Sequence, residues 1–321
     1  MTTATKTRRP ARKTAAAGTT DKPKFDPYQA VTDRIVALME AGTNPWRKPW
    51  AVSGGFPRSI GSGKGYRGIN PFLLMVTAAE QGYTSPWWGT YKAIAERGGQ
   101  VRKGEKGTLV VFWSTFDSKD PAEVDAKGNP RKIFFLKTYR VFNAQQADGL
   151  AEQYTAEPAP RGEFEAIDAC EVVLSGYLAR TGIPVAHGGN RAAYSPGADT
   201  IVLPDRDAFT GGSAEYYGTA FHEAAHSTGH ADRLNRPELT GFAHFGDSLY
   251  SREELVAELT AAMLAGVTGI APATEDNSAA YLASWAKVLK GDAKLVVQAA
   301  AKAQRAADLI LGADPSADAG A

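Results

Sequence analysis

The sequence predicts an α+β fold, and three observations lead to this prediction. Stretches with apolar residues at helical spacing and short alternating stretches typical of strands both occur along the chain. A His-Glu-x-x-His motif, residues 222–226, lies on a predicted helix that follows three short predicted strands. No apolar run has the length needed to cross a bilayer, and the N-terminus lacks the apolar core of a secretory signal. We therefore expect a soluble, cytoplasmic protein without a membrane partner.

Length and charge predict two parts of different character. The 321 residues suggest two domains, each able to bury its own core. Residues 1–24 carry seven basic and one acidic side chain, and residues 25–150 carry seventeen and eleven. Residues 151–321 carry twelve basic and twenty-three acidic side chains, and the whole chain has a net charge of +1. This asymmetry predicts a front half that binds a polyanion, although an uneven solvated surface would give the same counts.

A single cysteine, Cys170, rules out an internal disulfide and fits a reducing compartment. Cys170 lies in an apolar run within a predicted helix, so we expect it to pack rather than react.

The front half is predicted to be a small α+β domain spanning residues 25–150. Residues 1–24 are Thr, Ala, Lys and Arg without apolar periodicity, which predicts a disordered basic arm. Helices are expected over residues 28–39, 70–81 and 91–97, and strands over residues 108–113 and 132–142.

Aromatic residues beside cations in the front half are typical of proteins that bind single strands, because rings stack on bases while cations follow phosphates. We expect Phe112, Phe134 and Leu136 to belong to the core instead. The predicted stacking residues are Trp46, Trp50, Tyr66 and Trp88. The predicted phosphate-binding residues are Arg47, Lys48, Lys64, Arg67, Arg102, Lys103 and Lys106.

The back half is predicted to span residues 164–312, after a linker over residues 151–163 that contains two prolines. Residues 313–321 are expected to be a disordered tail. The expected helices are 164–180, 214–229, 252–265, 280–289 and 293–311, and the expected strands are 184–187, 192–195 and 200–203.

The motif on the helix over residues 214–229 predicts a zinc site. His222 and His226 are four residues apart and therefore lie on one face of a helix, where both imidazoles can reach one Zn²⁺. Glu223 lies beside them, in the position of a general base for a water molecule at the metal. Two histidines that face solvent or pack in the core are the alternative.

Two residues compete for the place of the third ligand. Asp232 has the spacing of a metzincin ligand, whereas Glu254 would come from a following helix, as in a His₂Glu site. Residue chemistry favours Glu254, and Glu258 could then accept the free ring N–H of a ligand histidine. In the plainer alternative, Ser251 and Glu254 form a helix-capping box and both glutamates are solvated.

Taken together, these segments resemble the ArdC-type antirestriction proteins. The resemblance in the front half lies in residues 31–35, 45–50, 66–70 and 101–108, and in the back half in residues 222–236 and 250–258. It implies an N-terminal single-stranded-DNA-binding domain followed by a zincin-like metallopeptidase domain in which Glu254 completes the zinc site. It also implies that the protein coats incoming plasmid or phage DNA and counters restriction. Single-stranded DNA is the implied partner, with double-stranded DNA and restriction-modification proteins as further candidates.

Three functions compete at this point. The first combines DNA binding with zinc-dependent peptide hydrolysis, the second uses the zincin fold only as a clamp, and the third is a protease for proteins associated with DNA. A clamp needs the ligands but no general base, so the presence of Glu223 favours chemistry. Tyr250 and His230 are candidates for stabilising an oxyanion.

Overall fold

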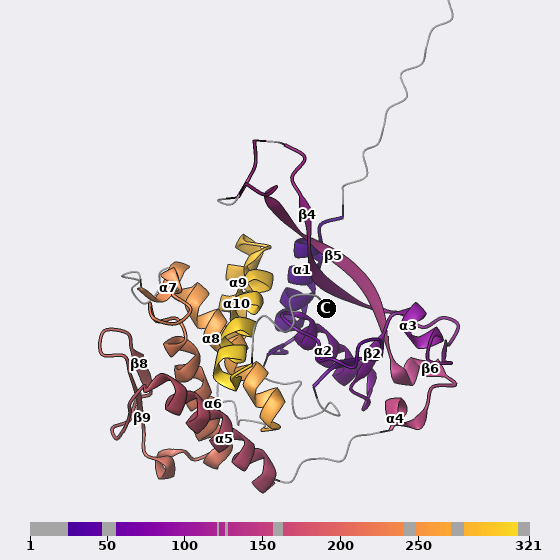
Figure 1. Ribbon diagram of the computed structural model, residues 1–321. Helices are drawn as coiled ribbons and strands as arrows, with labels where there is room; N and C mark the ends of the chain where they lie inside the picture. Colours follow the sequence, from indigo (N-terminus) through magenta and orange to yellow (C-terminus); the bar gives the residue numbers. More distant parts are fainter. Residues whose placement is uncertain are drawn as a thin grey trace, which may run out of the picture.

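The computed structural model describes residues 25–46, 56–120, 122–125, 128–156, 163–240, 248–270 and 279–313. Figure 1 shows a twisted sheet with a long hairpin in the front half and a group of helices in the back half. Helices and strands both contribute to each half, which confirms the predicted α+β class.

The front half is organised around a four-stranded sheet with the order β1-β2-β5-β4. Strands β4 and β5 pair antiparallel along their length, from Thr108↔Val141 to Asp117↔Lys132, and form the hairpin. A separate two-stranded sheet joins β3 to β6. The elements are α1 (Pro27–Glu40), β1 (Arg58–Ser59), α2 (Asn70–Gln81), β2 (Trp87–Gly89), α3 (Tyr91–Ala95), β3 (Gln100–Val101), β4 (Thr108–Asp117), β5 (Lys132–Asn143), the 3₁₀ turn η2 (Ala144–Gln146), β6 (Ala147–Asp148) and α4 (Glu152–Thr155).

Local signals in the sequence begin and end the two front helices. The side chain of Asp26 accepts a hydrogen bond from the backbone N–H of Tyr28 and so caps α1. Helix α2 ends at Gly82, whose φ of 72° is a left-handed conformation that glycine adopts without strain. The side chain of Asn70 bonds both the N–H and the C=O of Val111, at 2.9 and 2.7 Å, which joins the start of α2 to β4.

The back half places a small sheet beside a group of helices. The sheet has the order β7-β9-β8, and helix α6 contacts both β8 and β9. Helix α8 packs against α6 and α10 (Figure 1). The elements are α5 (Glu163–Thr181), β7 (Val185–His187), β8 (Ala193–Ser195), β9 (Thr200–Leu203), the 3₁₀ turn η3 (Arg206–Ala208), α6 (Gly212–Ser227), α7 (Pro237–Thr240), α8 (Ser248–Thr268), α9 (Ala279–Gly291) and α10 (Leu295–Leu311).

The two halves share one hydrophobic core, which differs from the expectation of two separate cores. Apolar side chains of α1 and α2 belong to the same buried cluster as those of α6, α8, α9 and α10. Trp46 meets Trp285 edge to face with ring centroids 6.2 Å apart. Thr32 Oγ1 also donates to the carbonyl oxygen of Ala293 at 2.7 Å. The domain boundaries therefore stay a prediction, but the halves pack as one body.

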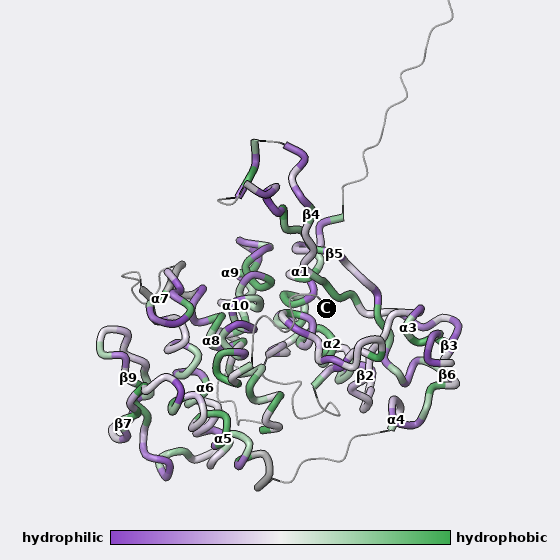
Figure 2. Tube along the Cα trace, viewed as in Figure 1, coloured by the Kyte–Doolittle hydropathy of each residue, from purple (hydrophilic) through white to green (hydrophobic). Residues whose placement is uncertain are grey.

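Hydropathy follows this arrangement in Figure 2, where much of α8 and α10 is apolar and polar residues gather around α3 and β3. None of the helices in the described part of the chain is both long and apolar enough to span a membrane.

Candidate functional site

Helices α6 and α8 bring the predicted metal ligands together. His222 and His226 lie one turn apart on α6, and their Nε2 atoms are 3.1 Å apart. The Glu254 carboxylate on α8 faces them, with oxygens 3.5 Å from His222 Nε2 and 3.4 Å from His226 Nε2. One ligand atom from each of the three side chains lies within 4.8 Å of the others.

These separations fit a four-coordinate ion. Bonds of about 2.0–2.1 Å in a tetrahedral site place neighbouring ligand atoms about 3.3 Å from each other. The two Nε2 atoms are 3.1 Å apart, and each lies close to that spacing from a different oxygen of Glu254, His226 Nε2 at 3.4 Å from Oε1 and His222 Nε2 at 3.5 Å from Oε2. Two imidazole nitrogens and a carboxylate oxygen leave one position for water, as in catalytic zinc sites.

The charges around the histidines favour a cation. Burial by itself would raise the pKa of Glu254, but hydrogen bonds with His222 and His226 hold it well below its usual range. Burial by itself would lower the pKa of His226, but hydrogen bonds with Glu253 and Glu254 raise it to about 10. Because metal ligands bind in their deprotonated form, a divalent ion and a proton would compete for this histidine.

Glu253, rather than the predicted Glu258, supports the ligand histidine. His226 Nδ1 donates to Glu253 Oε1 at 3.2 Å, and Arg236 donates to both oxygens of Glu253, at 2.5 and 2.8 Å. Glu258 lies one turn further along α8, where it accepts a hydrogen bond from the hydroxyl of Tyr281 at 3.2 Å. Neighbouring residues on a helix are about 100° apart, so Glu254 reaches the ligand site while Glu253 lies behind His226. The feature of the sequence that could have identified this support is that Glu253 stands directly before the candidate ligand Glu254.

The candidate base Glu223 is 8% exposed. Its carboxylate makes no hydrogen bond or ion pair with any residue that the structure describes. The carboxylate oxygens of Glu223 are not among the buried polar atoms that lack a hydrogen-bond partner, so this group keeps contact with solvent.

The other sequence candidates lie elsewhere. The side chain of Asp232 is 88% exposed and lies 3.6 Å from His230 Nδ1, outside the group of three ligands. The side chain of Tyr250 lies outside the described residues. Ser251 lies inside α8, which begins at Ser248, so it is not at the N-cap position that the capping-box alternative requires.

Comparisons with known proteins find a matching family model for each half of the chain. Residues 25–142 match the model for the N-terminal domain of anti-restriction factor ArdC, and residues 173–302 match that of a zincin-like metallopeptidase (MPTase-PolyVal). The metal-free crystal structure of antirestriction ArdC from plasmid R388 is 44% identical, with a TM-score of 0.70, covering 89% of this chain and 97% of that one. The chain belongs to the ArdC antirestriction family. The Mn(II)-bound structure of the R388 protein gives the same identity and TM-score, covering 90% and 98%.

Relatives of this ArdC family member include longer proteins. The uncharacterised protein y4eC of Sinorhizobium fredii is 36% identical over 301 residues, covering 90% of this chain and 94% of that protein. The DNA primase TraC of Escherichia coli is 36% identical over 310 residues, covering 90% of this chain. This chain spans only 20% of the length of that TraC protein.

Three predicted stacking residues of the ArdC N-terminal domain are buried, so the prediction that they meet bases is wrong. Trp46 and Trp88 are 0% and 1% exposed, and Tyr66 is 6% exposed. Trp46 fills the junction between the halves, and the hydroxyl of Tyr66 donates to the carbonyl oxygen of Trp88 at 3.3 Å. Burial raises the pKa of Tyr66. These rings are large apolar groups that the small front domain needs for its core.

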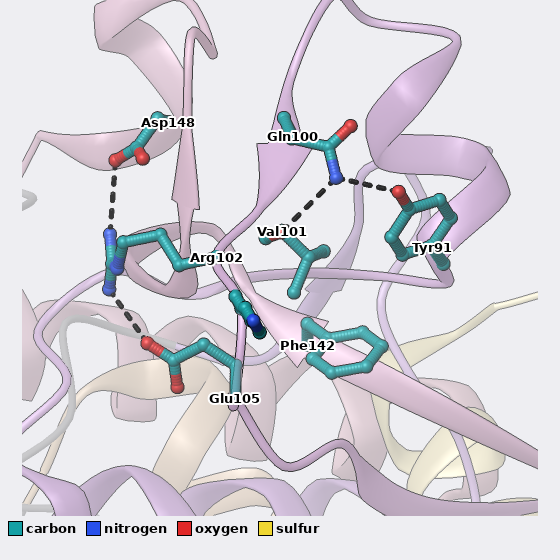
Figure 3. Close-up of a pocket in the computed structure, with 8 residues that line it drawn as sticks. Tyr91, Gln100, Val101, Arg102, Glu105, Phe142 and Asp148 are labelled. Carbon is teal, nitrogen blue, oxygen red and sulfur yellow. Dashed lines mark hydrogen bonds and ion pairs between the residues drawn. The ribbon is translucent and has the colours of Figure 1, made fainter.

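Several predicted cations have partners within the protein. Arg67 pairs with Asp308 of α10 at 2.5 Å, which joins the halves. Arg102 pairs with Glu105 and Asp148 at 3.0 and 3.3 Å, beside an open pocket of about 590 Å³ (Figure 3).

The other predicted cations are either exposed or outside the described residues. Lys64, Lys103 and Lys106 are exposed. Arg47, Lys48 and the predicted stacking residue Trp50 lie outside the described residues.

Exposed aromatic residues gather instead on the β4–β5 hairpin. The sequence placed Phe134 in the core, which is wrong because it is 67% exposed, whereas Leu136 is buried at 9% and Phe112 is half-buried. Phe116 and Tyr139 are 48% and 43% exposed. The outer part of the hairpin projects beyond the helices that bury its inner part (Figure 1). Alternation of apolar and polar residues could not show at which residue that burial ends.

Proposed function

We propose that this chain is a single-stranded-DNA-binding antirestriction protein whose back half is a zinc-dependent peptidase, and that it protects incoming plasmid or phage DNA. The observation that carries the enzymatic part is the convergence of His222, His226 and Glu254 beside the unpartnered carboxylate of Glu223.

In this proposal His222, His226 and Glu254 hold Zn²⁺, and Glu253 orients His226 through its Nδ1. A bound Zn²⁺ would supply a Lewis acid and would lower the pKa of water towards 7. Glu223 is next to His222 in the sequence and has no competing partner, so its carboxylate is free to accept a proton and to pass it to the leaving amine nitrogen.

The DNA-binding part is supported by charge and by relatives. Residues 25–150 carry a net charge of +6, whereas the back half is acidic. Two kinds of relative carry names that point to DNA, an antirestriction protein from a plasmid and a DNA primase. Restriction-modification proteins are the further partners that an antirestriction role suggests.

The test compares wild type with Glu223→Gln, which keeps the shape of the side chain but removes the base. We expect equal zinc content by elemental analysis, equal affinity for single-stranded DNA, and peptide cleavage lower by about 10²–10⁴-fold. Transfer of a plasmid into a restricting recipient is measured in parallel. If Glu223→Gln protects DNA as well as wild type and no peptide is cut, the domain is a clamp and the peptidase proposal fails.

A further inference from the structure

One face of the β4–β5 hairpin carries four aromatic rings and a lysine. Residues directly opposite each other in an antiparallel pair lie on the same face, and the register pairs Phe112 with Lys137, Ser114 with Phe135, and Val110 with Tyr139. Alternation adds Phe116 to this set. We call Phe112, Phe116, Phe135, Lys137 and Tyr139 the hairpin ring face.

The rings of this face lie in two contacting pairs. Phe112 and Tyr139 meet edge to face with centroids 5.5 Å apart, and Phe116 and Phe135 are tilted at the same separation. Lys137 extends over Phe135, with its Nζ 5.6 Å from the ring centroid. The pairs hold the rings in fixed orientations, although Phe116 and Tyr139 remain close to half exposed.

Core packing accounts for the base of the hairpin on both faces, since Val110 and Val141 on the hairpin ring face belong to a second buried cluster, but it does not account for the outer rings. Val111 and Leu136 on the opposite face belong to the main core, whereas Trp113 on that face is 46% exposed and meets Tyr28 of α1 with ring centroids 6.2 Å apart. On the hairpin ring face, Phe112 is the ring that packs against a buried cluster. The hairpin also projects beyond the helices, as Figure 1 shows.

We propose that the hairpin ring face stacks the bases of single-stranded DNA. This inference rests on the proposed DNA-binding function and names its surface. Base faces stack on aromatic side chains without sequence preference, whereas the faces of paired bases in a duplex are covered by their neighbours. A lysine among the rings places a cation where a phosphate must pass.

Charge along the two strands favours a polyanion. In these two strands Lys137 is the one charged residue on the hairpin ring face, whereas Lys132, Arg140 and the one acidic residue, Asp117, lie on the opposite face, where Asp117 pairs with Lys132 at 3.2 Å. From Phe112 to Phe116 the strand rises about 13 Å. About four nucleotides at a spacing of about 3.4 Å cover that length, so we expect a short footprint on this face.

A second copy of the chain is the competing occupant, because β4 is the outer strand of the sheet. The two occupants predict different results, since pairing between copies depends on protein concentration while DNA binding depends on salt.

The experiment uses fluorescence anisotropy to measure the affinity of the full chain for a labelled oligothymidylate of twelve nucleotides. Phe116→Ala and Tyr139→Ala should each raise the dissociation constant about 5- to 100-fold if a base stacks there. Lys137→Gln should reduce the slope of log affinity against log salt by about 0.7. Phe134→Ala is the matched control, because Phe134 is 67% exposed on the opposite face of the same hairpin, and should change the constant less than about two-fold. Urea unfolding checks that every variant is folded.

Photocrosslinking gives a second readout that does not depend on affinity. An oligonucleotide with 5-iodouracil should crosslink to peptides from residues 108–117 and 132–143, and a duplex of the same length should not.

Three outcomes overturn the inference, and they differ from one another. If wild type binds single strands and the ring variants bind equally well, the surface is wrong but the proposed function stands. If wild type binds no single-stranded DNA, the proposed function and the surface fail together. If sedimentation shows a dimer that Phe116→Ala dissociates while DNA binding is unchanged, the face belongs to a second copy.

Discussion

At the scale of single residues, the candidate metal site depends on a buried network in which His226, Glu253 and Arg236 are joined by hydrogen bonds. Arg236 is 4% exposed and reaches the Thr228 hydroxyl at 2.6 Å and the Ala225 carbonyl oxygen at 2.8 Å, in addition to Glu253. Gly229 is required here by close approach, since a Cβ at this position would lie 2.9 Å from Arg236 Cζ. The turn that follows α6 is therefore built around the arginine that fixes Glu253.

Arg236→Met tests this arrangement. Removing one member of a buried ion pair leaves an uncompensated charge, so the free energy of unfolding should fall by about 3–5 kcal/mol. Zinc affinity should also fall, by about 10- to 100-fold, because Glu253 loses the partner that positions it. Urea unfolding in the presence of a chelator measures the first effect, and competition with a zinc indicator measures the second.

Arg34→Met is the control for that measurement, because Arg34 pairs with Glu80 at a surface where the two side chains are 41% and 39% exposed. It should cost less than about 1 kcal/mol. Equal losses of unfolding free energy in the two variants would contradict the larger contribution expected of the buried Arg236–Glu253 pair.

Asp199 gives a prediction for pH. A hydrogen bond from Arg233 is the largest of the causes that lower the pKa of Asp199, and the Tyr194 hydroxyl donates to the same carboxylate at 2.7 Å. A carboxyl group with a lowered folded pKa stabilises the protein above its ordinary pKa of about 3.9, and this contribution is lost as pH falls through the folded value.

Asp199→Asn isolates this contribution. Asn tolerates the φ of 45° at this position, so the backbone should not be strained. The difference in unfolding free energy between wild type and variant should be constant between about pH 5 and 8 and should shrink below about pH 4. Urea titrations across this range measure it, and a difference that grows in acid would reverse the sign of the assigned shift.

At the scale of elements, helices and strands with clear periodicity were predictable. Helix α2 was predicted as residues 70–81 and is found there, because Pro71 begins it and Gly82 ends it. The approach of His222 and His226 to each other was predictable because their spacing is local. Burial of Trp46 and Trp88 was not, because Trp46 packs against Trp285 and Trp88 shares a buried cluster with Val110 and Val141, which are all distant in the sequence. The support from Glu253 was missed because it depends on which way α8 is rotated against α6.

Helix α10 carries a stripe of small residues against α8. Ala299, Ala300, Ala303 and Ala307 are all at most 3% exposed, and Thr260 Oγ1 lies 3.4 Å from the carbonyl oxygen of Ala303. Ala303→Leu should therefore lower the free energy of unfolding by about 1–3 kcal/mol through overpacking. Ala301→Leu, at a half-buried position on the same helix, should cost less. Equal urea midpoints for the two variants would show that the helices can move apart without cost.

At the scale of the whole molecule, the shared core links the front half, which carries the proposed DNA-binding surface, to the back half, which carries the candidate metal site. Trp46 and Trp285 meet across the junction, and Gly68 N donates to Gln304 Oε1 at 3.0 Å beside the Arg67–Asp308 pair. These contacts predict that the halves unfold together. A ligand of one half should then stabilise the other, because a ligand that binds only the folded state stabilises every part that unfolds with it.

Zinc binding is the means to test that coupling. With free zinc at about one hundred times its dissociation constant, the stabilisation should be about 2.7 kcal/mol. Hydrogen exchange followed by mass spectrometry reports on peptides from α2 in the front half and α6 in the back half separately. A chelator should speed exchange of the slowest amides in both peptides by a similar factor, whereas Trp285→Ala, which removes a ring at the junction, should confine the effect to α6. A chelator effect limited to α6 in wild type would show that the shared core does not couple the halves.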